Sequence, residues 1–541
     1  SKVEGQKIPN TIFSGASVAL LIQVCIVYWA TMLLRQSSDW GADSTAVHYA
    51  MHLDHFAKPL AVWIRQYPTL TAVLTVMTHW VYGIATALAV FGGVKGPYRA
   101  AAVLAMVGVH LIFHFGLAIG LFPFISAISW LVLTPSWVWD KLEKLSIRRV
   151  PRKATIIVPK GNRAALVWSH IMQTFLMLKK VTIEEQKDAQ WEIICCEERH
   201  SRANGLIPLF KASPLFWVFT PVVRWLGSLN ERCYQAIVTR SGWAWRFVSH
   251  LRFRPIPIKI HWMTQVLVLT LLVYIVAWNV GTLKKNTTLV WGDTSVTFSP
   301  PRLPSDYKSV GSAIRIDQRW GMFSPKPLRS DGWFMIPATL ADGTTFDLFK
   351  DGEPITWEKP EWVKDTYKNQ RWRKYSMNLR RKEYKKHRSN YGSYLCRKWN
   401  RGVPKEKKIK QLNILYMQEV TLADGAGPIE CINLWTHWCT PGAKKLKPQY
   451  RNQCDRVSAI GSAKRLAREA CLCSRWDNEK RRERCITHLE KRHKNLKKKW
   501  VNPLLTKQEK STINEALGSF QSCVQKISPT KLTLLDHLQE D

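Results

Sequence analysis

Acidic residues are scarce in this sequence. Its 541 residues include 40 Asp and Glu against 79 Lys and Arg, which gives a formal net charge of +39. A basic excess of this size favours anionic partners, namely lipid headgroups, nucleic acid or acidic surfaces of other proteins. The alternative is a solvated basic surface that serves no specific partner.

Four long stretches lack every Asp, Glu, Lys and Arg, which excludes a wholly soluble protein. A helix needs about 20 apolar residues to cross the hydrocarbon core, and each stretch is long enough. The third has 40 residues and is too long for one helix, so Pro123 predicts a break followed by a second, short helix. The sequence therefore predicts an integral membrane α-helical bundle with about five spanning helices. The stretches are Ala16 to Leu34, Thr69 to Val94, Ala100 to Trp139 and Trp262 to Leu283.

The sequence also lacks a cleavable signal peptide, because its first apolar run is long enough to span and has no small-residue cleavage pattern. The basic segment 141–260 contains no spanning run, and the positive-inside tendency places it on the inner side. Within it, Ala212 to Val223 is too short to span and is expected to be a surface-lying or buried helix. Residues 284–541 then fall on the outer or lumenal side.

The domain organisation follows from these assignments. We expect a small inner segment that is α/β-like, and an outer basic domain of the α+β class. The predicted parts are a membrane domain at 1–140, the inner segment at 141–260, a last spanning helix at 261–283, a β-rich and then basic outer domain at 284–405, and a cysteine-containing basic extension at 406–541.

The outer domain opens with strand-like text and continues with charged helices. Asp342-Gly343, between two alternating apolar runs, predicts a hairpin turn. Predicted strands lie at Thr288 to Phe298, Gly332 to Leu340, Thr344 to Phe349 and Leu412 to Leu422, and predicted helices at Arg371 to Asn400 and 455 to 526.

Histidines stand in two of the predicted spanning helices. His110 and His114 are four residues apart and share one helix face, and His79 lies on the preceding helix. Two imidazoles at this spacing suit metal binding or proton relay, and ionisable groups within a membrane are functional candidates. The alternative is neutral histidines that hydrogen-bond to neighbouring helices.

Acids and imidazoles also gather in the predicted outer loop after the first helix. Asp39, Asp43 and Asp54 stand there, with His52 and His55 beside the last of them. Such groups suit acid–base chemistry at the outer mouth of the helices. They suit capping and loop closure equally well, and we favour that interpretation.

Eight of the twelve cysteines lie beyond residue 390, and an even number in an oxidising compartment predicts disulfides with 105 alternative pairings. A zinc site is the alternative, because Cys471, Cys473, Cys485 and His488 offer four ligands of suitable type, although their spacing fits no common zinc finger. The eight are Cys396, Cys431, Cys439, Cys454, Cys471, Cys473, Cys485 and Cys523.

The basic and aromatic text from Arg371 to Trp399 has the composition of a single-strand nucleic-acid platform. On the outer face of a membrane, however, anionic lipid headgroups or a partner subunit fit better, and we expect no nucleic acid. Asn286-Thr287-Thr288 is a glycosylation sequon, but its closeness to the bilayer disfavours modification.

The first 140 residues resemble the second half of the horizontally transferred transmembrane (HTTM) domain, the membrane fold shared with vitamin K-dependent gamma-carboxylases. The matching elements occur in the family order and at family-like spacing. They are Asp39-Trp40, Ser44 to Ala50, Leu53 to Leu60, Tyr67-Pro68, Leu74-Thr75, His110, Gly120 to Pro123, and Pro135 to Asp140.

Two later segments resemble parts of bacterial members of this family. Residues 150–250, especially Ser213-Pro214-Leu215 and the run to Tyr234, resemble a DCC-type thiol-disulfide oxidoreductase-like domain. Its signature Cys-x-x-Cys is missing between Ala154 and Phe175, and the adjacent Cys195-Cys196 pair does not replace it. Ile316 to Pro325, Asp331-Gly332-Trp333 and Arg371 to Tyr375 resemble the outer region of those members.

The resemblance implies that the chain carries only part of the family's membrane domain, so that another membrane subunit supplies further helices. We therefore expect a divergent membrane subunit that scaffolds or completes a larger complex. One alternative is a split carboxylase-like or oxidoreductase enzyme with a quinone or vitamin K-like cofactor, and another is an anionic-lipid-binding protein. The expected location is an energy-transducing inner membrane, organellar or bacterial.

Overall fold

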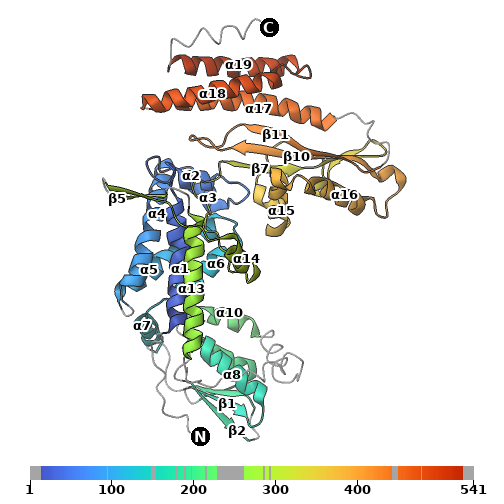
Figure 1. Cartoon of the computed structure of the whole chain (residues 1–541). Helices are drawn as coiled ribbons and strands as arrows, with labels where there is room; N and C mark the ends of the chain where they lie inside the picture. The colour runs from blue at the N-terminus through green and yellow to red at the C-terminus, as the bar shows by residue number, and fades with distance from the viewer. Residues whose placement is uncertain are drawn as a thin grey trace. The chain divides into compact units, whose positions relative to one another are not determined.

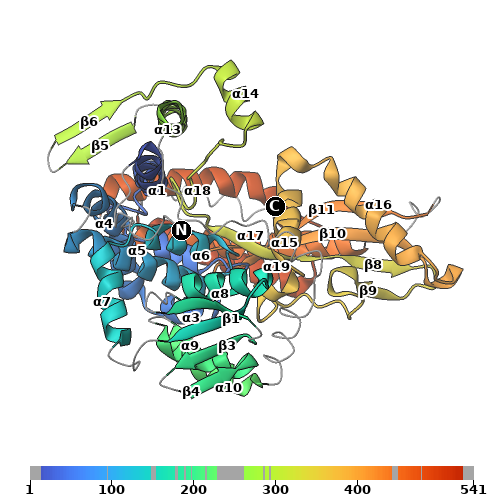
Figure 2. The same ribbon diagram turned by 90° about the horizontal axis from the view of Figure 1, so that it is seen from below.

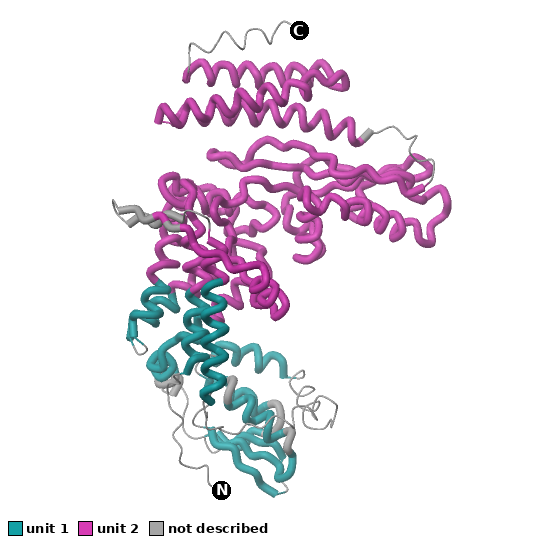
Figure 3. The backbone as a smooth tube through the Cα atoms, in the orientation of Figure 1, with its two compact units in different colours: residues 1–25, 85–104, 130–277 teal, residues 26–84, 105–129, 278–541 magenta. Residues whose placement is uncertain are grey.

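A computed structural model describes most of the chain. The described residues are 14–93, 96–147, 154–176, 181–187, 190–195, 198–213, 216–227, 261–283, 287–291, 294–440, 449–476 and 478–527. The chain divides into two compact units, which we call unit 1 and unit 2 (Figure 3). Unit 1 consists of residues 1–25, 85–104 and 130–277, and unit 2 of residues 26–84, 105–129 and 278–541.

Among the described residues, four helices are long and apolar enough to cross a membrane, and a bent pair raises the number to five if that pair is one span. They mark the chain as a membrane protein with a helical membrane part, as the sequence predicts. The four are α1 (Gly15–Leu34), α4 (Pro68–Phe91), α5 (Pro97–Gly116) and α13 (Trp262–Thr282), and the bent pair is α6 (Phe122–Leu131) with α7 (Ser136–Ile147).

Proline and glycine set the boundaries of these helices. Pro68 and Pro97 are each the first residue of a helix, where the missing N–H has no partner to lose. The expected break in the third apolar stretch is confirmed, and it falls just before Pro123, where Gly120 adopts a left-handed φ of 73°. The α6–α7 pair bends by 95°.

The apolar surface of the spanning helices is largely uncovered by protein. Only 6% of the apolar window of α13 is buried, against 39% for α1. Val266, Leu267 and Val273 on α13 are more than half exposed, and so is Trp80 on α4. Such faces are stable only against lipid or against other membrane helices.

Unit 1 contains a four-stranded mixed sheet with helices packed on it, so the α/β character expected of the inner segment is present. Strand order is β2-β1-β3-β4, with β1 parallel to β2 through helix α8 and antiparallel to β3. Helix α8 lies against the sheet (Figure 2), and Met172 of α8 belongs to the same buried core as Ile156 and Val158 of β1. The elements are β1 (Thr155–Pro159), α8 (Arg163–Phe175), β2 (Thr182–Gln186), β3 (Glu192–Cys195), β4 (Glu198–Ser201), α9 (Leu206–Ala212) and α10 (Thr220–Trp225).

The short apolar stretch in unit 1 is helical and lies at the surface, in agreement with the prediction. Between α9 and the end of α10, Trp217, Phe219 and Val222 are about half exposed, and Trp225 is 82% exposed. Pro214 and Leu215, which carry part of the DCC-type resemblance, lie outside the described residues, as do Cys196 and Tyr234. The side chain of Cys195 is buried in the core of the sheet.

Unit 2 contains the outer sheet, in which β10 is the central strand. Strand β10 pairs antiparallel with β11 on one side and with β7 and β8 on the other, and β8 pairs with β9. Helices α15 and α16 cover one face of the sheet and α17 the other (Figure 1). The elements are β7 (Ser330–Met335), β8 (Pro337–Leu340), β9 (Thr345–Asp347), α15 (Gln370–Arg380), α16 (His387–Asn400), β10 (Ile409–Val420), β11 (Ile429–Trp438) and α17 (Gln449–Ser474).

Two further helices complete a helical layer with α17. Helices α18 (Glu479–Trp500) and α19 (Lys507–Gln525) pack on it through a core that includes Leu466, Ile486 and Phe520. A capping box formed by Thr506 and Glu509 begins α19. The remaining elements of unit 2 are α2 (Ala46–Met51), α3 (Pro59–Ile64), the hairpin β5 (Thr287–Trp291) and β6 (Thr294–Phe298), and α14 (Ser305–Ala313).

The outer-domain predictions are confirmed in outline and need correction in detail. The Asp342-Gly343 turn joins β8 to β9 as expected, and three charged helices fill the region after residue 449. The predicted strand from Gly332 to Leu340 is divided at Ile336 into β7 and β8, because the N–H of Ile336 bonds to the Asp347 carboxylate instead of to a strand. Strand β11 was not predicted. Asn286 of the sequon lies outside the described residues.

Candidate functional site

All three candidate acids of the outer loop form ion pairs. Asp39 Oδ1 lies 2.5 Å from Arg329 Nη2, and Asp43 lies 2.8 Å from Arg481 Nη2. Arg481 also holds the pKa of Asp43 below its usual value through that hydrogen bond. The two arginines stand hundreds of residues further along the chain, so the loop is fastened to the outer domain.

Asp54 belongs to a larger buried network. Its carboxylate contacts Arg65 Nη1 at 2.6 Å and Lys359 Nζ at 2.5 Å, and the same Lys359 nitrogen lies 2.5 Å from Glu419 Oε2. Burial alone would raise the pKa of Asp54, but Lys359 and Arg65 outweigh it and lower that pKa. Burial raises the pKa of Glu419. Two cations thus balance two carboxylates, in an arrangement that suits stability rather than proton transfer.

A second connection joins the same loop to β7 and α15. The backbone N–H of His55 donates to Asp331 Oδ2 at 3.0 Å, and its ring Nδ1 bonds to the other carboxylate oxygen. Arg373 Nη1 donates to the carbonyls of His55 at 3.0 Å and Ala118 at 2.7 Å, and its guanidinium lies 4.3 Å from the ring of Phe56. His55, Asp331 and Arg373 are buried, so their hydrogen bonds fix the loop rigidly.

His110 is fully buried and hydrogen-bonded inside the helical part of unit 2. Its Nε2 lies 2.6 Å from the hydroxyl of Tyr28 on α1, and the ring of Tyr28 meets that of Tyr82 edge-on. The Nδ1 atoms of His110 and His79 have no hydrogen-bond partner among the described residues. His110 therefore fits the interpretation of a histidine bonded to a neighbouring helix, with one ring nitrogen still available.

His114 takes no part in that contact. Its ring packs against Phe124, and its carbonyl accepts a hydrogen bond from Lys58 Nζ at 2.6 Å. Within the part of the chain that the structure describes, no group of three or more His, Cys, Asp or Glu side chains is arranged to hold a metal ion.

Arg35 is the one group near the end of α1 that sequence reasoning missed. Only 6% of it is exposed, and its guanidinium lies 3.7 Å from the Trp40 ring and 4.5 Å from the Tyr82 ring. Its Nε and Nη1 atoms are buried without a hydrogen-bond partner among the described residues. The sequence signal for Arg35 was its position as the first charged residue after a long apolar run. A cation buried there needs compensating contacts, such as those with aromatic rings.

The segment 316–325, which carries part of the family resemblance, holds the ends of two spanning helices. Trp40 Nε1 donates to the carbonyl of Phe323 at 2.9 Å, and Thr31 Oγ1 donates to that of Trp320 at 3.0 Å. At the end of α13, Trp278 Nε1 donates to the carbonyl of Gln318 at 2.8 Å. In the part of the chain that the structure describes, this segment therefore has a structural role, because it holds the ends of α1 and α13.

The eight candidate cysteines form four disulfides. The pairs are Cys396–Cys439, Cys431–Cys454, Cys471–Cys523 and Cys473–Cys485. Three of the four residues of the zinc alternative are thereby oxidised, and a disulfide sulfur is not the thiolate that zinc requires. The pairing therefore favours the disulfide prediction over the zinc alternative, and His488 is exposed on α18.

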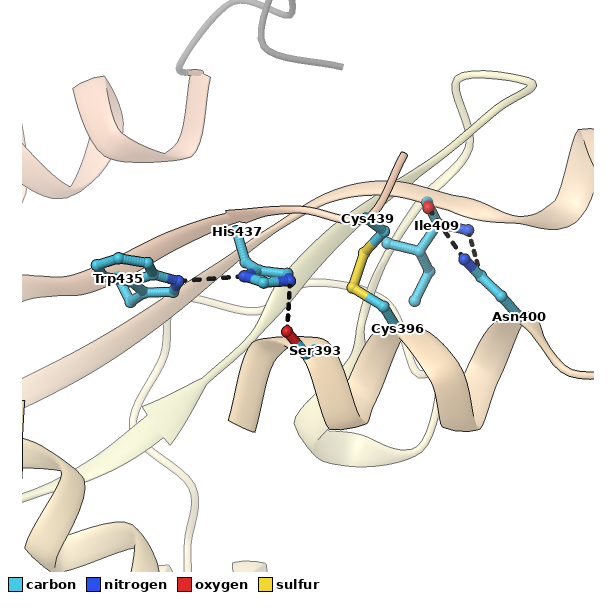
Figure 4. The surroundings of a disulfide bond; sticks show 7 residues. All are labelled: Ser393, Cys396, Asn400, Ile409, Trp435, His437 and Cys439. Carbon is cyan, nitrogen blue, oxygen red and sulfur yellow. Dashed lines mark hydrogen bonds between the residues drawn. A yellow bond between two sulfur atoms is a disulfide. The ribbon is translucent and has the colours of Figure 1, made fainter. Parts of the chain in front are cut away.

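A serine and a histidine lie side by side next to the first disulfide (Figure 4). His437 Nε2 is 3.4 Å from Ser393 Oγ, while its Nδ1 accepts the indole N–H of Trp435 at 3.3 Å. An indole nitrogen only donates, so the proton of the neutral ring is on Nε2 and points to Ser393. Burial also lowers the pKa of His437. The ring therefore donates to the serine and does not act as its base.

Described residues of unit 2 line a small pocket and a larger groove. A pocket of about 70 Å³ is lined by aromatic side chains including Trp372, Tyr391 and Tyr394. A groove of about 930 Å³ runs between β11 and the ends of α17 and α18. The groove is large enough for a macromolecular segment, whereas the pocket holds a group no larger than a few waters.

One side of α18 carries a stripe of basic side chains. The helix has ten Lys and Arg against three Glu, and Lys480, Arg484, Lys491 and Lys494 are exposed at helical spacing. Among the described residues these four have no ion-pair partner, whereas Arg481 on a neighbouring side of the helix binds Asp43.

The chain matches no protein-family model, no curated protein and no solved structure in the corresponding comparisons.

Proposed function

We propose that the chain is a non-catalytic subunit of a larger membrane complex, a divergent relative of the HTTM domain that presents a rigid basic platform to its partners. The ion pairs of Asp39, Asp43 and Asp54 carry this proposal. A general acid or base must reach a substrate proton, but these carboxylates are occupied by cations of the same chain. These ion pairs join the loop after α1 to the outer domain, as expected of a subunit with a structural role.

The surface of the outer domain supports the same function. The basic stripe of α18 lacks acidic partners among the described residues, while the exposed apolar face of α13 needs lipid or further helices. A partner with an acidic surface would pair with the basic stripe of α18. A further membrane subunit would cover the apolar face of α13. Nucleic acid is not expected on this side of a membrane.

The disulfides support the proposed side of the membrane. Four disulfides in residues 396–523 favour an oxidising compartment, so we place these residues on the outer or lumenal side. The membrane that we propose is an energy-transducing inner membrane of an organelle or bacterium. Residues before α13 then lie on the inner side, where positive charge favours them.

The test is purification of the full chain in a mild detergent, followed by mass spectrometry of the proteins and lipids that remain bound. A stoichiometric set of membrane subunits is expected. A variant with the stripe reversed at Lys480, Arg484, Lys491 and Lys494, each to Glu, should lose outer-side partners. The matched control reverses four exposed basic residues of another surface, Lys382, Lys385, Lys386 and Arg401, and should retain them. A lone, stable monomer contradicts the proposal, and recovery of anionic lipid alone favours a lipid-binding protein.

A second candidate rests on Arg35. Its buried Nε and Nη1 atoms have no hydrogen-bond partner among the described residues, and the Nδ1 atom of His110 has none either, while its Nε2 bonds to Tyr28. A carbonyl-bearing quinone or vitamin K-like cofactor fits this set of donors. Its carbonyl oxygens would accept from Arg35, and the chain would be half of a split carboxylase-like or oxidoreductase enzyme. Extraction of a stoichiometric quinone from the purified chain, lost in Arg35→Met, would favour this function over the first.

A further inference from the structure

Strand β11 forms the edge of the outer sheet. The strand order places it beyond β10, and among the described residues no strand pairs with its other side. At about 3.3 Å per residue, its ten residues present an edge roughly 33 Å long. Unpaired N–H and C=O groups along such an edge are a template for another strand.

The edge lies in the groove of about 930 Å³ and forms one of its walls. Arg451 and Ser458 of α17 form part of the opposite wall, and Lys498, Lys499 and Asn502 complete it at the end of α18. No described side chain fills this space. An extended segment that enters it meets the strand on one side and these polar groups on the other.

The charged side chains that line the groove indicate what kind of segment can bind there. Arg451 and Lys498 have no ion-pair partner among the described residues, and Lys499 Nζ contacts only the hydroxyl of Ser458, at 3.1 Å. Of the two acids in the lining, Glu430 is neutralised by Arg465 at 2.7 Å, which leaves Asp455 against three cations. The wall is therefore net positive and complements a segment with acidic side chains.

The same charges exclude a second copy of this chain as the occupant. An edge-to-edge pair of two identical β11 strands brings the basic residues of both copies together, and like charges in contact disfavour association. A strand of opposite charge has no such penalty.

We propose that an acidic, extended segment of a partner protein adds as a strand to the free edge of β11. This rests on the proposed function, of which it identifies one partner-binding surface. Side chains of a strand alternate between two faces, so every second residue of the segment faces Lys498 and Lys499. An alternating pattern of acidic and small or β-branched residues therefore suits this groove.

The experiment uses the full chain in detergent micelles and a fluorescent peptide of about ten residues in which Glu alternates with Thr and Val. Binding is measured by anisotropy, and we expect at least roughly 10-fold weaker binding for the same peptide with Lys in place of Glu. The double variant Lys498→Glu with Lys499→Glu should also weaken binding by roughly 10-fold or more. Reversal of Lys382 and Lys385 to Glu, two exposed residues outside the groove lining and outside the basic stripe, should change it by less than about 2-fold.

A peptide methylated at alternate backbone nitrogens separates strand addition from charge alone. It retains every side chain but loses the N–H groups that pair with β11, so its binding should weaken by roughly 10-fold. Equal binding of this peptide overturns the inference, and so does equal loss in the two double variants. If native purification recovers partner subunits while the peptide does not bind, the inference fails and the proposed function stands.

Discussion

Lys359 is the cation on which two carboxylates of the outer domain depend. Its Nζ is within 2.5 Å of both Asp54 and Glu419, whose side chains are about one-tenth exposed. Lys359→Met removes the charge and leaves Glu419 unpaired, so it should lower the stability of the fold by about 2 kcal/mol, less than for a fully buried pair because Lys359 is itself 29% exposed. The midpoint of thermal unfolding, followed by tryptophan fluorescence in detergent, measures the change.

The matched control is Lys368→Met. Lys368 lies 3.3 Å from Asp351, but both side chains are more than half exposed, so its loss should shift the midpoint by no more than an exposed pair does. Equal midpoints for the two variants would show that the buried network contributes nothing beyond an ordinary surface contact.

His52 makes the stability of unit 2 depend on pH. Burial lowers its pKa from 6.5 to about 4, and its Nδ1 bonds to the carbonyl of His48 at 2.8 Å. As pH falls below about 6.5, the unfolded chain gains a proton that the folded chain refuses, so stability falls until the folded pKa is reached. Between pH 7 and pH 5 this amounts to about 2 kcal/mol, at 1.36 kcal/mol per pKa unit.

His52→Asn should flatten this pH dependence, because the asparagine amide keeps a donor for the carbonyl of His48 but does not titrate. The unfolding midpoint is measured at pH 7 and pH 5 for both proteins. His488→Asn, at an exposed position on α18, should leave the difference between the two pH values unchanged. Burial also lowers the pKa of His48, which therefore accounts for the pH dependence of stability that remains in His52→Asn. A steeper dependence in His52→Asn than in the native chain contradicts the assignment.

Gly461 sets the distance between α17 and the outer sheet. A Cβ atom there would lie 2.0 Å from the carbonyl oxygen of Ile429 on β11, and this oxygen belongs to backbone that cannot rotate away. Gly461→Ala should therefore separate helix from strand and lower stability by about 1–3 kcal/mol. Gly518→Ala, on α19, meets nothing within 4 Å and should raise stability by up to about 1 kcal/mol through helix propensity. Urea unfolding of the two variants measures both effects, and a stabilised Gly461→Ala would contradict the close packing.

Elements whose signal is local were predictable from the sequence. The spanning helices follow from uninterrupted apolar runs, and the turn between β8 and β9 follows from Asp342-Gly343. Strand β11 escaped prediction because His437, Asn433 and two tryptophans interrupt its apolar alternation, and its strand form depends on pairing with β10. Helix α15 was expected, but the inward direction of Arg373 was not, because its carbonyl partners come from loops more than 250 residues earlier.

At the candidate site, too, the residue types were recognisable from the sequence, whereas their partners elsewhere in the chain were not. Asp39, Asp43 and Asp54 were recognisable as acids gathered in one loop, and the sequence left catalysis and loop closure as alternatives. Their ion pairs favour loop closure, and the partners Arg329, Arg481 and Lys359 stand too far along the chain to be predicted from residue spacing. The cysteines were assigned to disulfides by their number and compartment, whereas the pairing among 105 arrangements required the fold.

The membrane topology of the whole chain gives the last prediction. In the proposed topology α13 crosses the membrane between the inner segment and the outer domain, so exposed positions on the two should be reached from opposite sides. Lys160→Cys, in the turn after β1, and Glu353→Cys, after β9, place a thiol on each. In sealed vesicles a membrane-impermeant maleimide should label only one of them, and in detergent it should label both; peptide mass mapping locates the label among the native cysteines. Because the four disulfides require an oxidising compartment, Glu353→Cys should be the one labelled from that side. Labelling of both positions in sealed vesicles would mean that α13 does not cross the membrane, and labelling of Glu353→Cys only from the reducing side would leave the disulfides without an oxidising environment.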